Sequence, residues 1–279
     1  IHPYFHDKIR LKYSKTEDVE NVDEIQHPIV RECLRKVEIE RGVEIASFAD
    51  VPAGTGLGSS SAFTVGLLNA LYAYKGKIVS KERLASEACE IEIDILKEPI
   101  GKQDQYASAY GNINHIRFNR DETVNVSLIL LTESARRKLE NNLCLYYIGG
   151  KRKAGDILNE QKNNISTHGN FQNLKKMIAL ADEFVDVLYK GEVDCIGSLL
   201  HKGWLYKKEL ASGISNEGID TLYSKALEHG ATGGKLLGAG GAGFLLFYST
   251  DNEKLQKHFQ CKILPFNIDR EGAKIIFYE

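Results

Sequence analysis

The stretch VPAGTGLGSSSAFTVGLLNALYAYK, residues 51–75, places three glycines directly before a long apolar run. Gly54, Gly56 and Gly58 permit backbone angles and close approaches that a Cβ atom would forbid. The apolar side chains that follow recur at helical spacing, at Phe63, Leu67, Leu71 and Tyr74. The stretch therefore predicts a flexible loop that leads into a helix over about 59–75, well anchored in the core.

The junction between this loop and its helix has the properties of an anion-binding site. The first N–H groups of a helix lack internal acceptors and carry the positive end of the helix dipole. A glycine loop ahead of them lets the backbone wrap an anion, most often a phosphate. Neither common phosphate motif matches, because no lysine follows Gly58 and because Ser59 stands where a dinucleotide fold has its third glycine. A tight turn is the alternative, but the serines at 59–61 favour phosphate.

A second candidate is the carboxylate of Glu92, in the segment KERLASEACEIEIDILK (81–97). The helical pattern gives two neighbouring apolar tracks, and Glu92 is the only charged residue in them. A carboxylate in an apolar stripe is costly unless it meets a cation or hydrogen-bond donors. Glu92 is thus either a helix-edge residue that leans into water or a ligand of Mg²⁺, which takes one or two carboxylates beside phosphate oxygens. The spacing alone leaves both interpretations open.

A third candidate is Asp104, in the stretch PIGKQDQYASAYG (99–111). Pro99 and Gly101 end one helix, and Asp104 falls in the first turn of the next. By itself it would be a capping residue, and this location favours the ionised carboxylate. An ionised carboxylate can also orient a hydroxyl and take its proton late in phosphoryl transfer. The second glycine cluster, GAGGAG (238–243), would let the backbone approach a ligand closely.

The rest of the chain mixes helices and strands in both halves and shows no repeat. Segment 132–142 is charged and has no apolar stripe of useful width, so we place a domain junction there, with domains over 1–138 and 139–279. A helix is expected over 28–41, with Gly42 just past its end. Further helices are predicted over 80–97, 103–110 and 252–260 and between 149 and 229, and strands over 8–15, 43–51, 112–119, 124–130, 143–148, 244–249, 262–268 and 273–278.

Composition argues against several classes of function. A formal net charge of −2 over 279 residues gives no reason to expect nucleic acid or an acidic membrane as a partner. No apolar run reaches the length of a membrane span. The five cysteines lie far apart and form no CxxC pair, so thiols in a reducing cytoplasm are expected rather than disulfides or a metal site. His27 and His201 are expected to pack or to cap a helix.

The stretch PAGTGLGSSSA (52–62) closely resembles the central ATP-binding motif of the GHMP kinases, a family that includes galactokinase, homoserine kinase, mevalonate kinase and phosphomevalonate kinase. LGAGGAGF (237–244) is similar to the third motif of that family, with Ala242 where many members have glycine. Within the family, the stretches 51–68, 99–111, 157–164 and 234–249 most resemble the heptose 7-phosphate kinases. The likeness covers essentially the whole chain. It implies an α+β fold, with an N-terminal domain like domain 2 of ribosomal protein S5 and a ferredoxin-like C-terminal domain.

The resemblance also implies a role for each motif. The glycine-serine stretch would wrap the phosphates of ATP, and Ser60 and Glu92 would bind Mg²⁺. Asp104 would be the catalytic acid/base that faces the acceptor hydroxyl. The loop 238–243 would support the phosphate loop and the acceptor pocket. The residues expected to bind ATP are Pro52, Gly54, Thr55, Gly56, Leu57, Gly58, Ser59, Ser60 and Ser61, and those expected to bind the acceptor are Lys102, Gln103, Arg152, Gly240 and Gly241, with Lys207 and Lys208 as further candidates for its phosphate.

The implied activity is that of a cytoplasmic kinase that uses ATP and Mg²⁺. It would phosphorylate the anomeric hydroxyl of D-glycero-D-manno-heptose 7-phosphate, a small sugar phosphate, to the 1,7-bisphosphate, in the activation of heptose for a surface polysaccharide. A GHMP kinase for another sugar or small alcohol would share the same ATP machinery. A non-catalytic relative that senses nucleotide or sugar would be expected to have lost Asp104 or Glu92, and both are present.

One feature of the family has no counterpart in this sequence. GHMP kinases open with a strand and a first motif that helps to bind the acceptor, and in a heptose kinase we expect that segment to precede Ile1. The sequence leaves open the anomer and the oligomeric state, for which a homodimer is one alternative.

Overall fold

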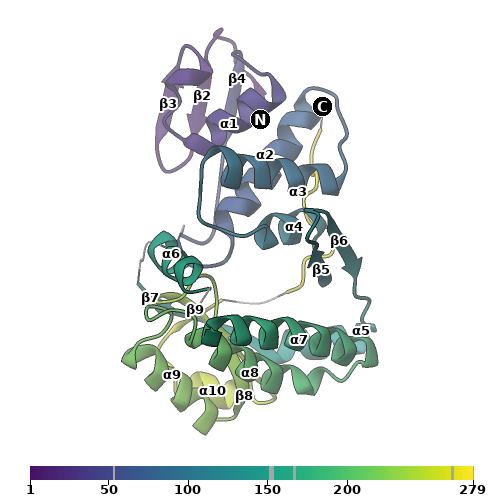
Figure 1. Cartoon of the computed structure of the whole chain (residues 1–279). Helices are drawn as coiled ribbons and strands as arrows, with labels where there is room; N and C mark the ends of the chain where they lie inside the picture. Colours follow the sequence, from purple (N-terminus) through teal and green to yellow (C-terminus); the bar gives the residue numbers. More distant parts are fainter. Residues whose placement is uncertain (53, 151–153, 166–167, 265–266, 279) are drawn as a thin grey trace. The chain divides into compact units, whose positions relative to one another are not determined.

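The computed structural model describes all residues of the chain except 53, 151–153, 166–167, 265–266 and 279. It divides into two compact units, each a mixture of helices and strands (Figure 1). The first unit consists of Ile1–Pro52, Gly58–Asn112 and Asp269–Glu279, and the second of Ala53–Leu57 and Ile113–Ile268. This is the α+β class that the sequence predicts.

The first unit contains a four-stranded sheet of order β1-β4-β2-β3. Its strands are β1 (His2–Pro3), β2 (Ile9–Lys12), β3 (Thr16–Val19) and β4 (Val43–Ala46). β2 and β3 form an antiparallel hairpin, whereas β2 and β4 run parallel, with β3 and α1 between them in the chain. The strand predicted over 8–15 is confirmed at Ile9–Lys12, but it ends earlier than expected, since the chain turns back after Lys12.

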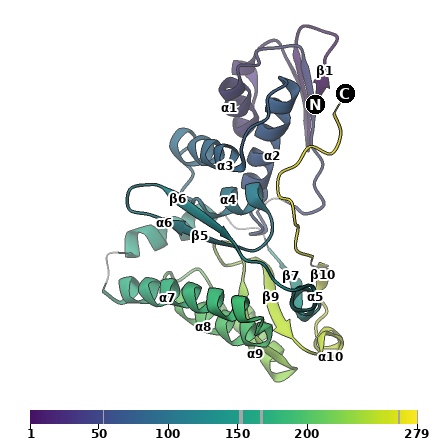
Figure 2. The same ribbon diagram turned by 90° about the vertical axis from the view of Figure 1, so that its right-hand side faces the viewer.

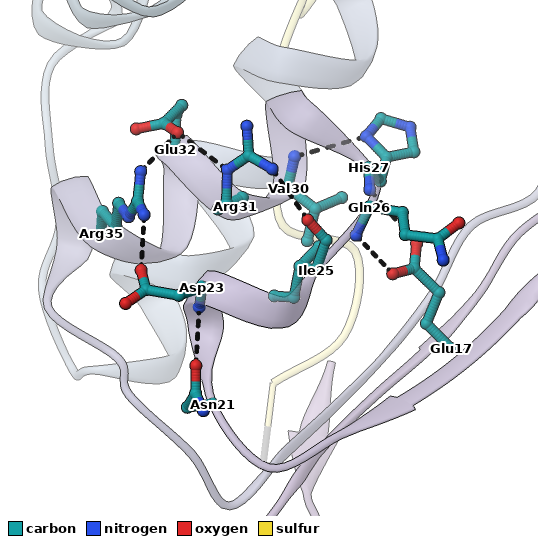
Figure 3. A network of polar contacts seen from close by, with 10 residues as sticks. All are labelled: Glu17, Asn21, Asp23, Ile25, Gln26, His27, Val30, Arg31, Glu32 and Arg35. Atoms are coloured by element: carbon teal, nitrogen blue, oxygen red, sulfur yellow. Dashed lines mark hydrogen bonds and ion pairs between the residues drawn. The ribbon is translucent and has the colours of Figure 1, made fainter.

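The helix between these strands, α1 (Pro28–Val37), begins in a network of polar contacts (Figure 3). His27 Nδ1 accepts a hydrogen bond from the N–H of Val30 at 3.4 Å, so His27 caps the helix as expected. The carboxylate of Glu17 accepts from the N–H groups of Gln26 and His27 just before the cap. The helix ends at Val37 rather than at 41, because Glu38 adopts a left-handed φ of 58°.

Helices α2 (Ser59–Tyr74), α3 (Lys81–Cys89) and α4 (Gln103–Tyr110) complete the core of the first unit. In Figure 2, α1, α2 and α3 lie on one side of the sheet. The helix predicted over 80–97 is α3 followed by a π-helical segment, η2 (Glu90–Ile95). The widened turn matters for the site, because it contains Glu92.

The C-terminal segment 269–278 also belongs to the first unit. The N–H of Asn112 donates to the carbonyl of Asp269 at 2.5 Å, and Lys81 Nζ bridges the carbonyls of Tyr110 and Glu271. The strand predicted over 273–278 is wrong, because within the described residues this segment pairs with no strand.

The second unit contains an antiparallel sheet of order β10-β7-β9-β8. In chain order this is 4-1-3-2, and helices lie in the first and last connections, as in a ferredoxin-like fold. Trp204, Tyr146, Phe247 and Tyr248 are completely buried in this unit. The strands are β7 (Leu143–Gly149), β8 (Ala231–Leu236), β9 (Gly243–Ser249) and β10 (Lys262–Leu264), and the connecting helices are α6 (Ala154–Asn164), α7 (His168–Lys190), α8 (Ile196–Lys208), α9 (Glu217–Glu228) and α10 (Asn252–Lys257).

The segment 132–142 forms a packed helix, α5 (Glu133–Asn142), after the hairpin of β5 (Asn114–Phe118) and β6 (Val124–Leu128). Thr132 Oγ1 caps α5 by accepting from the N–H of Ala135 at 3.2 Å. Ala135 and Leu139 are buried against Ile129, so the expectation that this segment lacks an apolar stripe is wrong. The domain boundary placed near residue 138 stays a prediction.

Two glycines of the first unit should respond to alanine with opposite signs. Gly111 ends α4 with a φ of 64°, and a Cβ atom there would lie 2.2 Å from the N atom of Gly272. We expect Gly111→Ala to lower the free energy of unfolding by about 1–3 kcal/mol, the usual cost of a strained backbone conformation. Gly66 lies exposed inside α2 with no atom within 4 Å of its Cβ position. We expect Gly66→Ala to raise the free energy by about 1 kcal/mol. Urea unfolding measures both, and effects of the same sign would contradict this packing.

Candidate active site

The first half of the glycine-serine loop packs in the second unit against residues 237–243, here called the second glycine segment. Gly56 has a φ of 80°, and a Cβ atom on it would lie 2.9 Å from the carbonyl oxygen of Leu237. A Cβ atom on Gly243 would lie 2.2 Å from the carbonyl oxygen of Thr55. Side chains at these glycines would separate the two backbones. The second glycine segment therefore packs directly against the backbone of the glycine-serine loop. This contact is compatible with the expectation that it supports the loop.

The second half of the loop belongs to the first unit and starts α2. Gly58 is the N-cap, with a left-handed φ of 67°, and no described side chain caps the helix. The hydroxyl-bearing side chains at the helix start differ in burial: Ser61 is 2% exposed, whereas Ser60 is open to solvent. An uncapped helix N-terminus behind three glycines leaves backbone N–H groups available to an anion.

The carboxylate of Asp104 lies beside this helix start, within the first unit. A Cβ atom on Gly58 would lie 3.1 Å from Oδ2 of Asp104, so a side chain at position 58 would crowd this carboxylate. Asp104 does not cap α4, because the N-cap residue is Lys102 and no side chain bonds there. The geometry thus disfavours the capping interpretation and places a carboxylate next to the expected phosphate site.

The environment of Asp104 also changes its proton affinity. Its side chain is accessible to solvent on one side, but the protein atoms around it desolvate the carboxylate and raise its pKa. The positive end of a helix dipole alone would lower the pKa of this carboxylate, so the direction found here is the opposite of the expected one. A raised pKa makes Asp104 a stronger base than an ordinary aspartate, which suits a group that accepts the proton of a hydroxyl.

Glu92 is buried, and none of the described residues supplies a cation to it. Its side chain is 1% exposed, which excludes a position at the water-facing edge of the helix. Nε2 of Gln105 donates to Oε2 of Glu92 at 2.7 Å. Within the described residues, no lysine, arginine or histidine lies at ion-pair distance from Glu92. A buried carboxylate held by a neutral amide fits a site for a metal cation, since burial without a counter-charge is costly.

Gln105 is a further candidate site residue, which the sequence analysis did not single out. Its side chain is completely buried, and its Oε1 has no hydrogen-bond partner among the described atoms. A signal was present in the sequence, because Gln105 shares the buried face of α4 with Tyr106 and Ala109. An amide on an apolar helix face requires a polar partner, as a carboxylate does.

The other predicted site residues fall in different places. In the first unit, Pro52 and Gln103 are exposed and Lys102 is half-buried. In the second unit, Gly240 and Gly241 pack on Ile214. The N–H of Gly241 donates to the carbonyl oxygen of Ile214 at 2.9 Å. Leu57 is half-buried, and Arg152 lies outside the described residues.

The two lysines at the end of α8 differ in their partners. Lys208 Nζ lies 3.1 Å from Oδ1 of Asp220, so a carboxylate already balances its charge. Lys207 Nζ instead donates to the carbonyls of Leu236 and Gly238, at 3.3 and 2.5 Å. Of the two, only Lys207 contacts the second glycine segment through its side chain.

Two general properties bear on the class of protein. None of the helices in the described part of the chain has the length and apolar character that a membrane span requires. All five cysteines are free thiols, and Cys33, Cys89 and Cys144 are buried.

Comparison with known proteins identifies the family. Residues 26–112 match the model of the GHMP kinases N terminal domain, and residues 184–263 match that of the GHMP kinases C terminal domain. A D-glycero-alpha-D-manno-heptose 7-phosphate kinase from Campylobacter jejuni is 30% identical over 259 residues, which cover 90% of this chain and 74% of the relative. A bifunctional fucokinase/GDP-fucose pyrophosphorylase from Arabidopsis thaliana is 27% identical over 81% of this chain but only 22% of its own length.

The fold of this chain is also similar to that of a solved structure. The crystal structure of a D-glycero-D-manno-heptose 1-phosphate kinase from Bacteroides thetaiotaomicron superposes with a TM-score of 0.78 at 23% identity, over 100% of this chain and 86% of that structure. The heptose kinase relative and the two matched domains, in the expected order, agree with the glycine loops described above. The chain belongs to the GHMP kinase family.

Proposed function

We propose that this kinase transfers the γ-phosphoryl group of ATP to the anomeric hydroxyl of D-glycero-D-manno-heptose 7-phosphate, which gives the 1,7-bisphosphate and ADP. The observation that carries the proposal is the carboxylate of Asp104 beside Gly58 at the uncapped start of α2. This proximity supports a general base beside a backbone phosphate site. The name of the Campylobacter jejuni relative supports heptose 7-phosphate as the acceptor.

The residues would divide the work of phosphoryl transfer as follows. The amides of the loop and of the first turn of α2 would bind the phosphates of ATP, and Glu92 with the hydroxyl of Ser60 would hold Mg²⁺. When bound, Mg²⁺ neutralises charge on the phosphate oxygens. Asp104 would orient the acceptor hydroxyl and accept its proton as the oxygen bonds to the γ-phosphorus and the bond to the leaving ADP oxygen breaks.

The acceptor is the part of the proposal that a substrate panel tests. The chain is incubated with Mg²⁺-ATP and heptose 7-phosphate, free heptose, fucose, galactose, mevalonate or homoserine, and products are identified by phosphorus NMR. We expect a new anomeric phosphate only with heptose 7-phosphate. Turnover of another acceptor with heptose 7-phosphate inert would identify a different GHMP kinase. Binding of ATP without product from any acceptor would favour a non-catalytic relative.

Asp104→Asn should separate catalysis from nucleotide binding. We expect turnover to fall by roughly 10²–10⁴-fold, the usual contribution of a general base, while affinity for ATP stays the same. In the wild type, kcat/KM should fall as the pH drops through the raised pKa of Asp104, because the protonated carboxyl cannot accept a proton.

The stability of the same variant gives a second readout. Because the folded-state pKa of Asp104 is raised, the ionised carboxylate opposes folding above that pKa, and this cost disappears as the pH falls. Asp104→Asn should therefore keep or raise the melting temperature at neutral pH. Wild-type turnover in this variant would exclude Asp104 as the base.

Glu92→Gln should weaken binding of the divalent cation. We expect the apparent affinity for Mg²⁺ in the kinase assay, and for Mn²⁺ measured by electron paramagnetic resonance with ADP present, to fall about 10–100-fold. The matched control is Glu90→Gln in the same π-helical segment, whose carboxylate pairs with Lys36 at 2.6 Å and is half exposed. That variant should titrate like the wild type. Identical titrations of both variants would remove Glu92 from the metal site.

A further inference from the structure

Two lysines of the second unit lie together beside the second glycine segment. Lys207 is in the last turn of α8 and Lys235 is in β8, and both are half-buried. Burial lowers the pKa of both amines, that of Lys207 to about 7. The positive charge of Lys235 contributes to the lowered pKa of Lys207, so the two ammonium groups lie close enough to repel each other.

Among the residues that the structure describes, neither lysine has an anionic partner. Lys207 donates two hydrogen bonds to the carbonyls of Leu236 and Gly238, which leaves one N–H for another acceptor. The side chain of Lys235 forms no hydrogen bond or ion pair with any described residue. Two like charges that are partly removed from water without a counter-ion destabilise the fold. A doubly charged anion between them would relieve this cost through charge-assisted hydrogen bonds.

The position of the pair indicates what kind of anion it meets. One of the two carbonyls that accept a hydrogen bond from Lys207 is that of Gly238. A Cβ atom on Gly238 would lie 2.5 Å from the Cα atom of Gly56. The two lysines therefore flank the segment that supports the expected phosphate loop, within the same unit. The hydrogen bonds to two carbonyls also fix the amine of Lys207, so little side-chain freedom is lost when it binds a ligand.

We propose that Lys207 and Lys235 form the subsite for the phosphate monoester that the acceptor carries. This inference rests on the proposed function, in which the acceptor arrives as a sugar phosphate. In the proposed function, the amides of the glycine loop and a metal ion at Glu92 would serve the phosphates of ATP, whereas the acceptor phosphate would need cations of its own. Lys208, the other candidate on α8, is already balanced by Asp220.

The test uses Lys235→Met, Lys207→Met and a control, Lys202→Met. Lys202 is an exposed residue of the same helix and pairs with Glu183 at 3.3 Å. Calorimetry measures the affinity of each variant for heptose 7-phosphate, free heptose, ADP and inorganic phosphate. We expect each of the first two variants to bind heptose 7-phosphate about 10–100-fold more weakly, with free heptose and ADP within about twofold of wild type. Lys202→Met should bind all four like the wild type.

Thermal unfolding excludes a merely structural role. Lys235→Met should keep or raise the melting temperature, because it removes an unpaired, partly buried charge. A lower melting temperature with equal losses for all ligands would show that the lysines only brace the loop, and would overturn the proposal. Loss of ADP affinity with heptose 7-phosphate unaffected would also overturn it, because the pair would then serve the nucleotide.

Failure of the proposed function has a different signature. If the wild type neither binds nor phosphorylates heptose 7-phosphate, that function is wrong and the acceptor assignment of the subsite is wrong with it. The affinity for inorganic phosphate then tests only whether Lys207 and Lys235 bind a phosphate group. Binding by the wild type and Lys202→Met, but not by Lys235→Met, would retain the pair as a phosphate site. Equal binding by all variants would exclude it.

Discussion

Contact between bare backbones at the two glycine-rich segments is the constraint on which the rest of this site depends. Gly56 packs on Gly238, and Gly243 packs on Thr55, at distances that no Cβ atom could occupy. This contact holds the loop in place while its next residue, Gly58, turns the chain into α2 in a left-handed conformation. The helix N-terminus that follows has no side-chain cap among the described residues, and the carboxylate of Asp104 lies against it, at a distance that a side chain at position 58 would crowd.

Each of the two units contains charges without an opposite charge to balance them among the described residues, and this suits the binding of ligands. Glu92 is a buried carboxylate without a cation, and Lys207 and Lys235 are half-buried amines without an anion, within the described part of the chain. Elsewhere, comparable charges are paired, as Arg136 is with Glu140 at 2.6 Å. Uncompensated charges oppose folding, and proteins concentrate them where substrates or metals complete them. Phosphoryl transfer needs protein groups of both charges, since it brings together negatively charged phosphates and a positively charged metal ion.

Much of the local structure could be predicted, because it depends on neighbours in the chain. The glycines at 54–58 and the apolar spacing after them predict α2 almost to the residue, and α4 likewise follows from Pro99 and Gly101. Errors arose where distant contacts decide. α1 stops early at the left-handed Glu38, and the segment 273–278, although apolar, finds no strand to pair with in the described chain.

The sequence by itself pointed to the family through its glycine motifs, and it singled out Glu92 as an isolated carboxylate in an apolar stripe, because both are local signals. The proposed roles of Asp104, Glu92 and the glycine loop follow from the resemblance to that family. Only the tertiary structure decided the environments of these groups. It buried Glu92 against Gln105 and raised the pKa of Asp104 by desolvation. It also separated Lys207 from its neighbour Lys208. Successive residues on a helix point about 100° apart, so one amine meets the glycine segment and the other meets a carboxylate. The burial of a side chain and the partners that it meets depend on residues far away in the chain. They therefore cannot be predicted from the pattern within one segment.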